Sequence, residues 1–366
     1  MGEQSGWQRG SLSMELKELG MDSWFANHVR ESCAAKQRLA RVMVVDRGQY
    51  TVRSEHGDVP AKATRKFMKS TTSSIDRACV GDWVCMDNQD SEEYASIHAV
   101  LPRKSFLRRK SAGKSTKLQM IAANIDVMFI VQSCHYDFNV SRLERYLVMA
   151  TEGHVEPVII LTKTDLLSTD VLQQLITEIH DAGITARIIT LSNVTGAGLS
   201  QVKESMECGK TYCLVGSSGV GKSTLINQLR GDDTLRTQTV SASGEGRHTT
   251  VRRQLFVLEQ GALLIDTPGM REVGILAVND GMADNFDDIH ELALQCKFSN
   301  CGHDNERGCA VLLAIKEGPL QLERYQNYIK LKAESERNDQ LKSRKGKKIK
   351  AFGHGIHHAK KRTNKS

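Results

Sequence analysis

The sequence predicts a protein of several domains, in which a central α/β domain lies between a small all-β domain and a helical lobe with a cluster of cysteines. Three observations predict this arrangement. A glycine-rich loop follows the apolar run Cys213–Val215, alternating apolar residues follow Leu39, and three cysteines and a histidine gather between Cys296 and Cys309. The chain has 366 residues, 40% of them hydrophobic, and is therefore long enough for two or three domains with cores of their own.

The first 37 residues are predicted to form an N-terminal arm. They are mostly polar around one short apolar stretch, Trp24–Ala26, which suits a helix or a loose segment. From residue 38 to residue 102, apolar residues alternate from Val42 onward and a turn is expected at Gly48. By itself this pattern predicts a small β-barrel or meander.

A basic linker is predicted at residues 103–118. Seven Lys or Arg residues and no acidic residue lie between Arg103 and Lys117. This run includes a Gly-Lys-Ser-Thr sequence at Gly113–Thr116, but Arg108 stands where a phosphate loop has its first glycine, and no apolar strand precedes it. We therefore interpret the run as linker.

The strongest motif is Gly216–Ser223, which fits the phosphate-loop pattern G-x-x-x-x-G-K-[ST] at every position. An apolar run that suits a buried strand precedes it, and a helix start follows it. The loop N–H groups and the helix N-terminus favour the binding of phosphate. Lys222 is expected to reach the β- and γ-phosphates, and Ser223 is expected to bind Mg²⁺. The predicted nucleotide-binding residues of this loop are Gly216, Ser217, Ser218, Gly219, Val220, Gly221, Lys222, Ser223 and Thr224.

Two further segments are expected near the γ-phosphate. An apolar strand runs into Asp266–Gly269, a D-x-x-G sequence, so Asp266 is expected to hold Mg²⁺ through water and the Gly269 amide to contact the γ-phosphate. The polar, glycine-rich stretch that ends in Thr249 and Thr250 suits a switch loop, and one of these threonines, assigned as Thr250, is expected to complete the Mg²⁺ shell. The alternative is a solvent loop without a role.

Upstream, Thr162–Asp165 resembles the guanine-reading motif N-K-x-D, with Thr162 in place of asparagine. Asp165 is expected to accept hydrogen bonds from guanine N1–H and N2–H₂, at about 1.5–3 kcal/mol per charge-assisted bond. Lys163 is expected to lie over the base. Ser192 and Asn193 stand where GTPases carry S-A-K and are further nucleotide-binding candidates. The departures at Thr162 and Asn193 leave the selectivity for guanine open.

A metal site is predicted at Cys296, Cys301, His303 and Cys309. Three thiolates and one imidazole complete a tetrahedral shell, which is typical of a structural zinc site. Free thiols and a surface histidine are the alternative. The chain has nine cysteines and no secretory pattern, so no disulfide framework is expected, and the other six cysteines are interpreted as buried or incidental. Helical spacing from Phe286 to Ala293 predicts a helix that leads into this lobe.

The net charge of +7 comes from the end of the chain. Residues 342–366 contain ten Lys or Arg and no acidic residue, which predicts a disordered basic tail. Such a tail suits RNA, and neutralising about six phosphates makes affinity strongly dependent on salt. A generic solubilising tail is the alternative. No apolar run approaches the ~20 residues of a membrane span, so we expect a cytoplasmic protein without a membrane partner, and a monomer.

The order of the motifs is the most specific signal, because the guanine motif comes first and the phosphate loop third. This is a circular permutation of the usual GTPase order. Together with Ile121–Asp126, Gly246–Thr250 and the cysteine cluster, it makes the chain resemble the bacterial ribosome small-subunit-dependent GTPase A family over residues 38–330.

The resemblance implies an RNA-binding OB-fold barrel at 38–102, a circularly permuted GTPase domain at 119–280 and a zinc-binding lobe at 281–341. It also implies a GTPase that binds the small (30S) ribosomal subunit, assists its late maturation, is stimulated by it and leaves after hydrolysis. His248 is the expected water-positioning residue, and Met270, where many GTPases place glutamine, predicts slow intrinsic turnover. Two alternatives stay open. One is an RNA-binding assembly factor with nucleotide as a structural ligand, and the other is a GTPase acting on a protein or tRNA.

Overall fold

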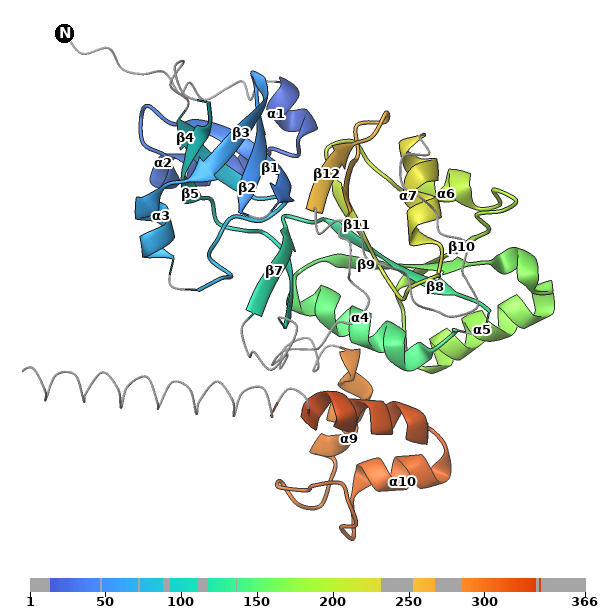
Figure 1. Ribbon diagram of the computed structural model, residues 1–366. Helices are drawn as coiled ribbons and strands as arrows, with labels where there is room; N and C mark the ends of the chain where they lie inside the picture. The colour runs from blue at the N-terminus through green and yellow to red at the C-terminus, as the bar shows by residue number, and fades with distance from the viewer. Residues whose placement is uncertain are drawn as a thin grey trace, which may run out of the picture. The chain divides into compact units, whose positions relative to one another are not determined.

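The structure is a computed structural model of the chain (Figure 1). It describes residues 14–46, 48–71, 73–87, 93–110, 118–135, 137–231, 253–266, 285–333 and 336. Two compact units can be separated, one of residues 1–108 with 119–273 and one of residues 109–118 with 274–366. Each unit is described by itself below. Among the described residues, no helix is long and apolar enough to cross a membrane.

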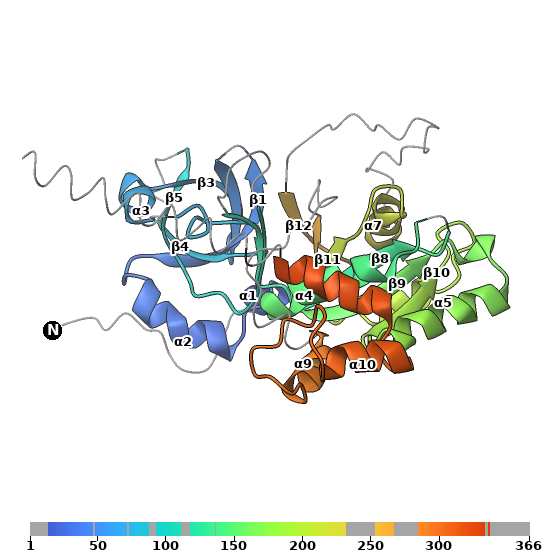
Figure 2. The ribbon, with the colours of Figure 1, turned by 90° about the horizontal axis from the view of Figure 1, so that it is seen from below.

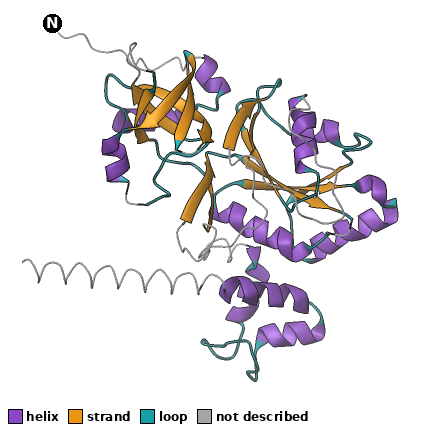
Figure 3. Ribbon diagram, viewed as in Figure 1, coloured by secondary structure: helices purple, strands orange, loops and turns teal. Residues whose placement is uncertain are grey.

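The N-terminal strands of the first unit close into a five-stranded barrel (Figure 3). Their order is β1-β2-β3-β5-β4, and β4 pairs back with β1. Strands β3 and β5 are parallel, whereas the other barrel pairs are antiparallel. This closed barrel confirms the OB-fold prediction. The strand bounds are β1 (Arg38–Asp46), β2 (Gln49–Ser54), β3 (Gly57–Ala63), β4 (Trp83–Asp87) and β5 (Ala95–Val100), with helix α3 (Arg65–Ser70) after β3.

Alternation along these strands places one set of side chains inside the barrel. Ala40 and Val42 of β1 and Val52 of β2 are fully buried in one cluster with Ile97 of β5. The turn expected at Gly48 is present, because Asp46 pairs with Gln49 across it. Gly48 has φ +85°, a left-handed conformation that a residue with a Cβ adopts at a cost.

Two short helices precede the barrel, α1 (Met14–Glu18) and α2 (Ser23–Ser32) (Figure 2). The side chain of Asp22 caps α2 by accepting hydrogen bonds from the N–H groups of Trp24 and Phe25, at 3.0 and 3.2 Å. Phe25 and Val29 bury the inner face of the helix in the core that contains Trp83 of β4. The predicted arm therefore contains a packed helix.

The first unit also contains a disulfide, which was not expected from the sequence, although one of its cysteines, Cys85, is buried as predicted. It joins Cys33, at the end of α2, to Cys85 in β4, with Cα atoms 5.3 Å apart. The two residues are 52 positions apart in the chain, and only the packing of α2 on the barrel brings them together.

Six consecutive strands of an eleven-stranded sheet, which the barrel strands continue beyond β12, form the centre of the first unit. The order of these six strands is β10-β9-β8-β11-β13-β12, and neighbours among them are parallel except that β12 is antiparallel to β13. Strand β11 leads into the phosphate loop, yet it is the fourth of these strands along the chain. This order confirms the permuted α/β domain. The bounds are β8 (Val127–Ser133), β9 (Glu156–Thr162), β10 (Arg187–Leu191), β11 (Thr211–Val215), β12 (Arg253–Val257) and β13 (Leu263–Asp266).

Helices cover both faces of these central strands (Figure 1). Met128 and Ile130 of β8 lie in one core cluster with Leu143 of α4, whereas Phe129 and Val131 lie in a second cluster with side chains of α6 and α7. Both faces of β8 are therefore buried, which explains its continuous apolar sequence. The helices are α4 (Val140–Glu152), the short η1 (Thr164–Leu166), α5 (Thr169–Asp181), α6 (Leu199–Glu204) and α7 (Lys222–Arg230).

Strand β6 (Phe106–Lys110) pairs with β7 (Leu118–Ala123) in a separate two-stranded sheet. Part of the segment expected as basic linker is therefore a strand, and Leu107 within it is buried. Residues 111–117, which include Lys114 and Lys117 of the basic run, lie outside the described residues.

A fully buried arginine joins the barrel to the central sheet. Arg41 of β1 is 1% exposed and donates hydrogen bonds to Asn124 O at 3.0 Å and to Thr211 Oγ1, at the start of β11, at 2.8 Å. It also donates to the carbonyls of Gly81 and Leu19. Burial lowers the pKa of Arg41 to about 10, and the nearby carboxylates Asp126 and Asp82 oppose this shift. Strand β1 also pairs with β12 through two residue pairs.

The second unit contains α9 (Asp287–Leu294), α10 (Ala310–Glu317) and a helical segment at residues 322–333. Helix α9 confirms the helical spacing expected from Phe286 onward. Arg324 holds the last helical segment to α9 through a bidentate pair with Asp288, at 2.8 Å for both bonds. Phe286 packs beside Tyr328, with ring centroids 5.5 Å apart. These contacts give the lobe a small core of its own.

Candidate nucleotide site and metal centre

The phosphate loop lies between β11 and α7, as the sequence predicts. Gly216 has φ +143°, and a Cβ there would lie 2.1 Å from the carbonyl oxygen of Val131 in β8. Gly221 has φ +98° and ends the loop where α7 begins at Lys222. Ser218, Gly219 and Ser223 are exposed, and Thr224 is half-buried. The loop backbone and the first turn of α7 thus stay open to an anion, which the helix N-terminus favours.

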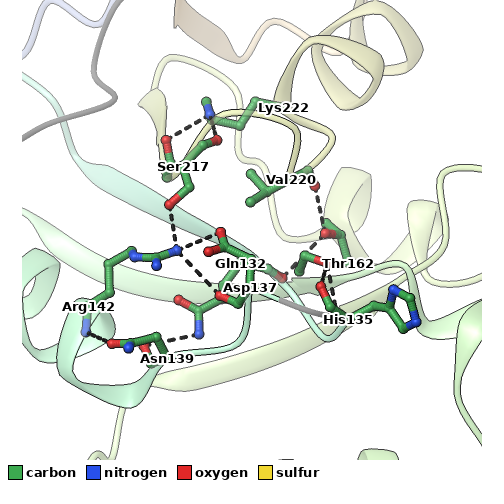
Figure 4. A network of polar contacts seen from close by, with 11 residues as sticks. Gln132, His135, Asp137, Asn139, Arg142, Thr162, Ser217, Val220 and Lys222 are labelled. Atoms are coloured by element: carbon green, nitrogen blue, oxygen red, sulfur yellow. Dashed lines mark hydrogen bonds and ion pairs between the residues drawn. The ribbon is translucent and has the colours of Figure 1, made fainter. Parts of the chain in front are cut away.

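Lys222 folds back over the loop. Its Nζ donates to the carbonyl of Gly216 at 2.7 Å and also to the carbonyl of Ser217 (Figure 4). Asp266 lies at the end of β13, which is adjacent to β11 in the sheet. Burial raises the pKa of Asp266, while Arg230 and Lys222 oppose the rise. A lysine at the loop and an acid at the end of the neighbouring strand β13 therefore lie near enough to interact electrostatically.

Thr162, which replaces the asparagine of the guanine motif, is hydrogen-bonded to the phosphate loop. Its side chain is fully buried, and Oγ1 donates to the carbonyl of Val220 in the phosphate loop at 2.7 Å (Figure 4). The carbonyl of Gln132 lies 3.3 Å from the same hydroxyl. One hydroxyl donor is therefore enough to attach this segment to the phosphate loop.

The two segments expected around the base lie together. Ser192 Oγ donates to Asp165 Oδ1 at 2.6 Å and also accepts from the N–H groups of Val194 and Thr195. Lys163, at the start of η1, has φ +61°, a left-handed conformation. Asp165 is thus oriented by a neighbouring loop before any base is bound.

Asn193 joins the base side of the site to the phosphate side. Its Nδ2 donates to the carbonyl of Gly221 at 3.2 Å, and its own carbonyl accepts from Gln228 Nε2 of α7 at 2.9 Å. Both hydrogen bonds fix the end of the phosphate loop. The second departure from the usual motif therefore has a structural partner in the loop.

Four predicted site residues are not placed. His248, Thr249, Thr250 and Gly269 lie outside the described residues. Their assignments stay predictions.

Arg142 is a residue of this site that the sequence does not reveal. It lies in the first turn of α4, and its Nη1 donates to Ser217 Oγ of the phosphate loop at 2.6 Å (Figure 4). Arg142 and Ser217 are 75 positions apart, and no nucleotide motif includes the arginine. What the sequence does offer is the position of Arg142, which comes after the carboxyl end of the apolar strand β8, at the start of the next helix.

The structure gathers Cys296, Cys301, His303 and Cys309 with their ligand atoms within 4.8 Å of one another. Tetrahedral zinc with ordinary bond lengths requires sulfur atoms about 3.8 Å apart and sulfur–nitrogen separations of about 3.5 Å. Cys296 Sγ lies 3.9 Å from Cys309 Sγ and 3.6 Å from His303 Nδ1, and His303 Nδ1 lies 3.3 Å from Cys309 Sγ. The donor set and its spacing therefore fit zinc.

Groups around the cluster favour the metal-binding forms of Cys296, His303 and Cys309, whereas burial raises the pKa of Cys301 to about 11. The N–H of Ala310 points at Cys296 Sγ at 3.3 Å, and the N–H of Leu312 at Cys309 Sγ at 3.4 Å, so the N-terminus of α10 favours thiolates. Burial lowers the pKa of His303, Lys332 adds to this, and Glu306 and Asp304 oppose it. The imidazole is thereby kept neutral, which is the form that binds metals.

Comparisons with known proteins agree with this geometry. The RsgA GTPase family model matches residues 100–276. "Small ribosomal subunit biogenesis GTPase RsgA 2" of Vibrio vulnificus is 36% identical over 344 residues, covering 94% of each chain. The protein of the same description from Lactiplantibacillus plantarum is 42% identical over 299 residues, covering 81% of this chain and 83% of the relative.

Solved structures resemble the chain as well. The crystal structure of YjeQ from Thermotoga maritima has a TM-score of 0.60 and 27% identity, covering 81% of this chain and 97% of that one. The crystal structure of YloQ, described as a circularly permuted GTPase, has a TM-score of 0.55 and 23% identity, covering 84% and 96%. The latter supports the fold alone.

Proposed function

We propose a function from the following premise: this chain belongs to the RsgA GTPase family and hydrolyses GTP. The proposed function is that the chain binds the small ribosomal subunit and assists its late maturation. Relatives similar to nearly the whole chain are named for small-subunit biogenesis. One structural observation carries the nucleotide-binding part of the proposal. Guanine-motif residues Thr162 and Asp165, Ser192 and the phosphate loop form one hydrogen-bonded site although their motifs follow the permuted order.

The site residues take the following roles. Asp165, oriented by Ser192, accepts hydrogen bonds from guanine, and Lys163 covers the base. The loop N–H groups and Lys222 bind the phosphates. The remaining nucleotide contacts are assigned to Thr162, Asn193, Gly216, Ser217, Ser218, Gly219, Val220, Gly221, Ser223, Thr224, Thr249, Thr250, Asp266 and Gly269.

Hydrolysis requires a water molecule in line with the γ-phosphorus. The oxygen of this water bonds to phosphorus as the bond to the β–γ bridging oxygen breaks, giving GDP and phosphate. Ser223 and Thr250, with Asp266 acting through water, would hold Mg²⁺, which would supply charge neutralisation at the phosphates. His248 is assigned to orient the water.

Zinc is assigned to the Cys296, Cys301, His303 and Cys309 cluster, where the spacing of the ligand atoms supports a closed structural site. Its role is to hold the lobe of residues 281–341 in shape. The barrel at 38–102 and the basic residues of the tail at 342–366 are assigned to ribosomal RNA. A factor of this kind acts in the bacterial cytoplasm, and we assign it as a monomer.

The proposal is tested by measuring GTP and ATP hydrolysis with and without purified small ribosomal subunits. We expect slow turnover alone and strong, GTP-selective stimulation by the subunit, because an external activator can add ~10³–10⁵ in rate. Co-sedimentation should be stronger with a non-hydrolysable GTP analogue than with GDP. Equal binding in both nucleotide states would contradict release upon hydrolysis.

One sequence feature favours a second candidate function. Met270 follows Gly269 where a glutamine often orients the water, and a thioether is a poor donor and acceptor. An RNA-binding assembly factor with nucleotide as a structural ligand would need no such group. Turnover below detection even with subunits, despite tight GTP binding, would favour this alternative.

A further inference from the structure

We propose that Arg142 is a positioning residue of the nucleotide site, which holds the first half of the phosphate loop while Lys222 engages the nucleotide. This inference rests on the nucleotide site of the proposed function. It assigns a role to the first turn of α4, which no nucleotide motif includes.

A single nitrogen atom of Arg142 makes the decisive contacts. Nη1 donates to Ser217 Oγ at 2.6 Å and to Asp137 Oδ2 at 2.6 Å, and the carbonyl of Asp137 lies at 3.3 Å (Figure 4). Asp137 thus fixes the guanidinium from one side, and the guanidinium fixes Ser217 from the other. Hydrogen bonds that include a charged group are roughly twice as strong as neutral ones.

Helix α4 gives this side chain a rigid base. Asn139 caps the helix, since its Oδ1 accepts from the N–H of Arg142 at 2.8 Å. The carbonyl of Asn139 accepts in turn from Gln132 Nε2, at the end of β8, at 3.2 Å. Leu143, the next residue of the helix, is fully buried in the core. The first turn of α4 therefore cannot shift without loss of both its cap and its packing.

Two cations hold Ser217 by different atoms. Lys222 contacts the carbonyls of Gly216 and Ser217, whereas Arg142 contacts the Ser217 hydroxyl. In a phosphate loop the lysine also binds the β- and γ-phosphates, so its bonds to the two carbonyls weaken when nucleotide enters. The bond from Arg142 involves no phosphate and can persist.

The second half of the loop has its own attachment, because Thr162 donates to the carbonyl of Val220. The loop is therefore fixed at both halves, by Arg142 from the first turn of α4 and by Thr162 from the end of β9. Without Arg142, the first half would have to be ordered each time a nucleotide binds, which costs conformational entropy. The loop cradles phosphates of both nucleotides, so the loss should affect GDP and GTP alike.

The test is fluorescent GDP and GTP-analogue binding by full-length Arg142→Ala, Ser217→Ala and the double variant. We expect each single change to weaken the binding of both nucleotides by about tenfold, and the double change to weaken it no further. The reason is that all three variants lose the same hydrogen bond, from Arg142 Nη1 to Ser217 Oγ. Subunit-stimulated kcat at saturating GTP should change less than threefold while KM rises about tenfold. Arg142→Lys, which keeps a cation, should restore part of the affinity.

Thermal unfolding separates positioning from a merely structural role. Arg142→Ala should leave the Tm of the nucleotide-free protein almost unchanged and reduce the rise in Tm that GDP causes. The matched control is Arg108→Ala, which removes an arginine whose Nε lies 3.0 Å from Glu152 Oε1 at the other end of α4. This control should keep wild-type nucleotide affinity.

Three results would overturn the inference. They are unchanged affinity in Arg142→Ala, single effects that multiply in the double variant, and a lowered nucleotide-free Tm with an undiminished GDP-induced rise. A wild-type protein that binds neither nucleotide would instead overturn the proposed function, and this inference with it.

Discussion

The nucleotide site and the cysteine cluster differ in how far apart their residues lie along the chain. Cys296 and Cys309 are 13 positions apart, whereas the contacts of Thr162 with Val220 and of Arg142 with Ser217 span 58 and 75 positions. A metal cluster within one short segment, as proposed for these four ligands, would depend on its ion for much of its shape. A site collected from several strand ends depends on the sheet, so each of its contacts should be replaceable at a limited cost.

The largest expected effect is the loss of the metal. Cys309→Ser should remove zinc and unfold the lobe, because a structural zinc site contributes about 10–16 kcal/mol to folding. Metal content and limited proteolysis of the lobe measure this. The control is Cys208→Ser, which changes an exposed free cysteine. GDP binding by the first unit should persist in both variants. A lobe that stays folded without zinc would contradict the expectation that the cysteine cluster depends on its ion.

The disulfide comes next, since it also joins distant parts of the chain. For a closed loop of 52 residues, its removal should lower the free energy of unfolding by about 3–4 kcal/mol. Denaturant unfolding of Cys33→Ser, and of wild-type protein with and without a thiol reductant, measures this loss. The reduced wild-type protein should resemble the variant. Identical curves with and without reductant would show that the bond adds no stability.

A smaller effect is expected for the base contact. Asp165→Ala removes the acceptor for guanine, so GTP affinity should fall by roughly 10–100-fold, at about 1.5–3 kcal/mol per charge-assisted bond. Weak ATP binding should not change, because adenine lacks the matching donors. Competition binding measures both, with the exposed Asp170→Ala of α5 as control. An equal loss for GTP and ATP would argue against Asp165 as the base reader.

The smallest effect concerns the hydroxyl that replaces an asparagine. Thr162→Val leaves the carbonyl of Val220 without this donor, which should cost about 1–3 kcal/mol. The expected result is a lower Tm and GTP affinity reduced by about tenfold, while Thr162→Ser keeps wild-type behaviour. Wild-type affinity in Thr162→Val would mean that the hydroxyl does not hold the loop.

The same contrast explains what the sequence could predict. Contiguous patterns were enough for the phosphate loop, the strand that ends at Asp266 and the cysteine cluster, because their chemistry lies within one segment. The barrel followed from alternation together with the family resemblance. His248 and Thr250 lie outside the described residues and stay predictions.

Contacts between distant segments could not be predicted from the sequence. Arg41 and Thr211 are 170 positions apart, and nothing in the local sequence of either residue indicates the other. A basic residue in a barrel strand would ordinarily be assigned to the surface, yet Arg41 is 1% exposed. The disulfide between Cys33 and Cys85 was missed for the same reason, since it depends on how α2 packs.

The pairing of β1 with β12 covers part of what would otherwise be an edge of the central strands. Strand β12 ends the order of the six central strands, and an uncovered edge strand presents N–H and C=O groups that can pair with another chain. Val44 and Val45 of β1 lie opposite Gln254 and Arg253 of β12, so the barrel covers part of this edge. Any change that separated the barrel from the sheet would therefore expose a template for aggregation as well as break a domain contact.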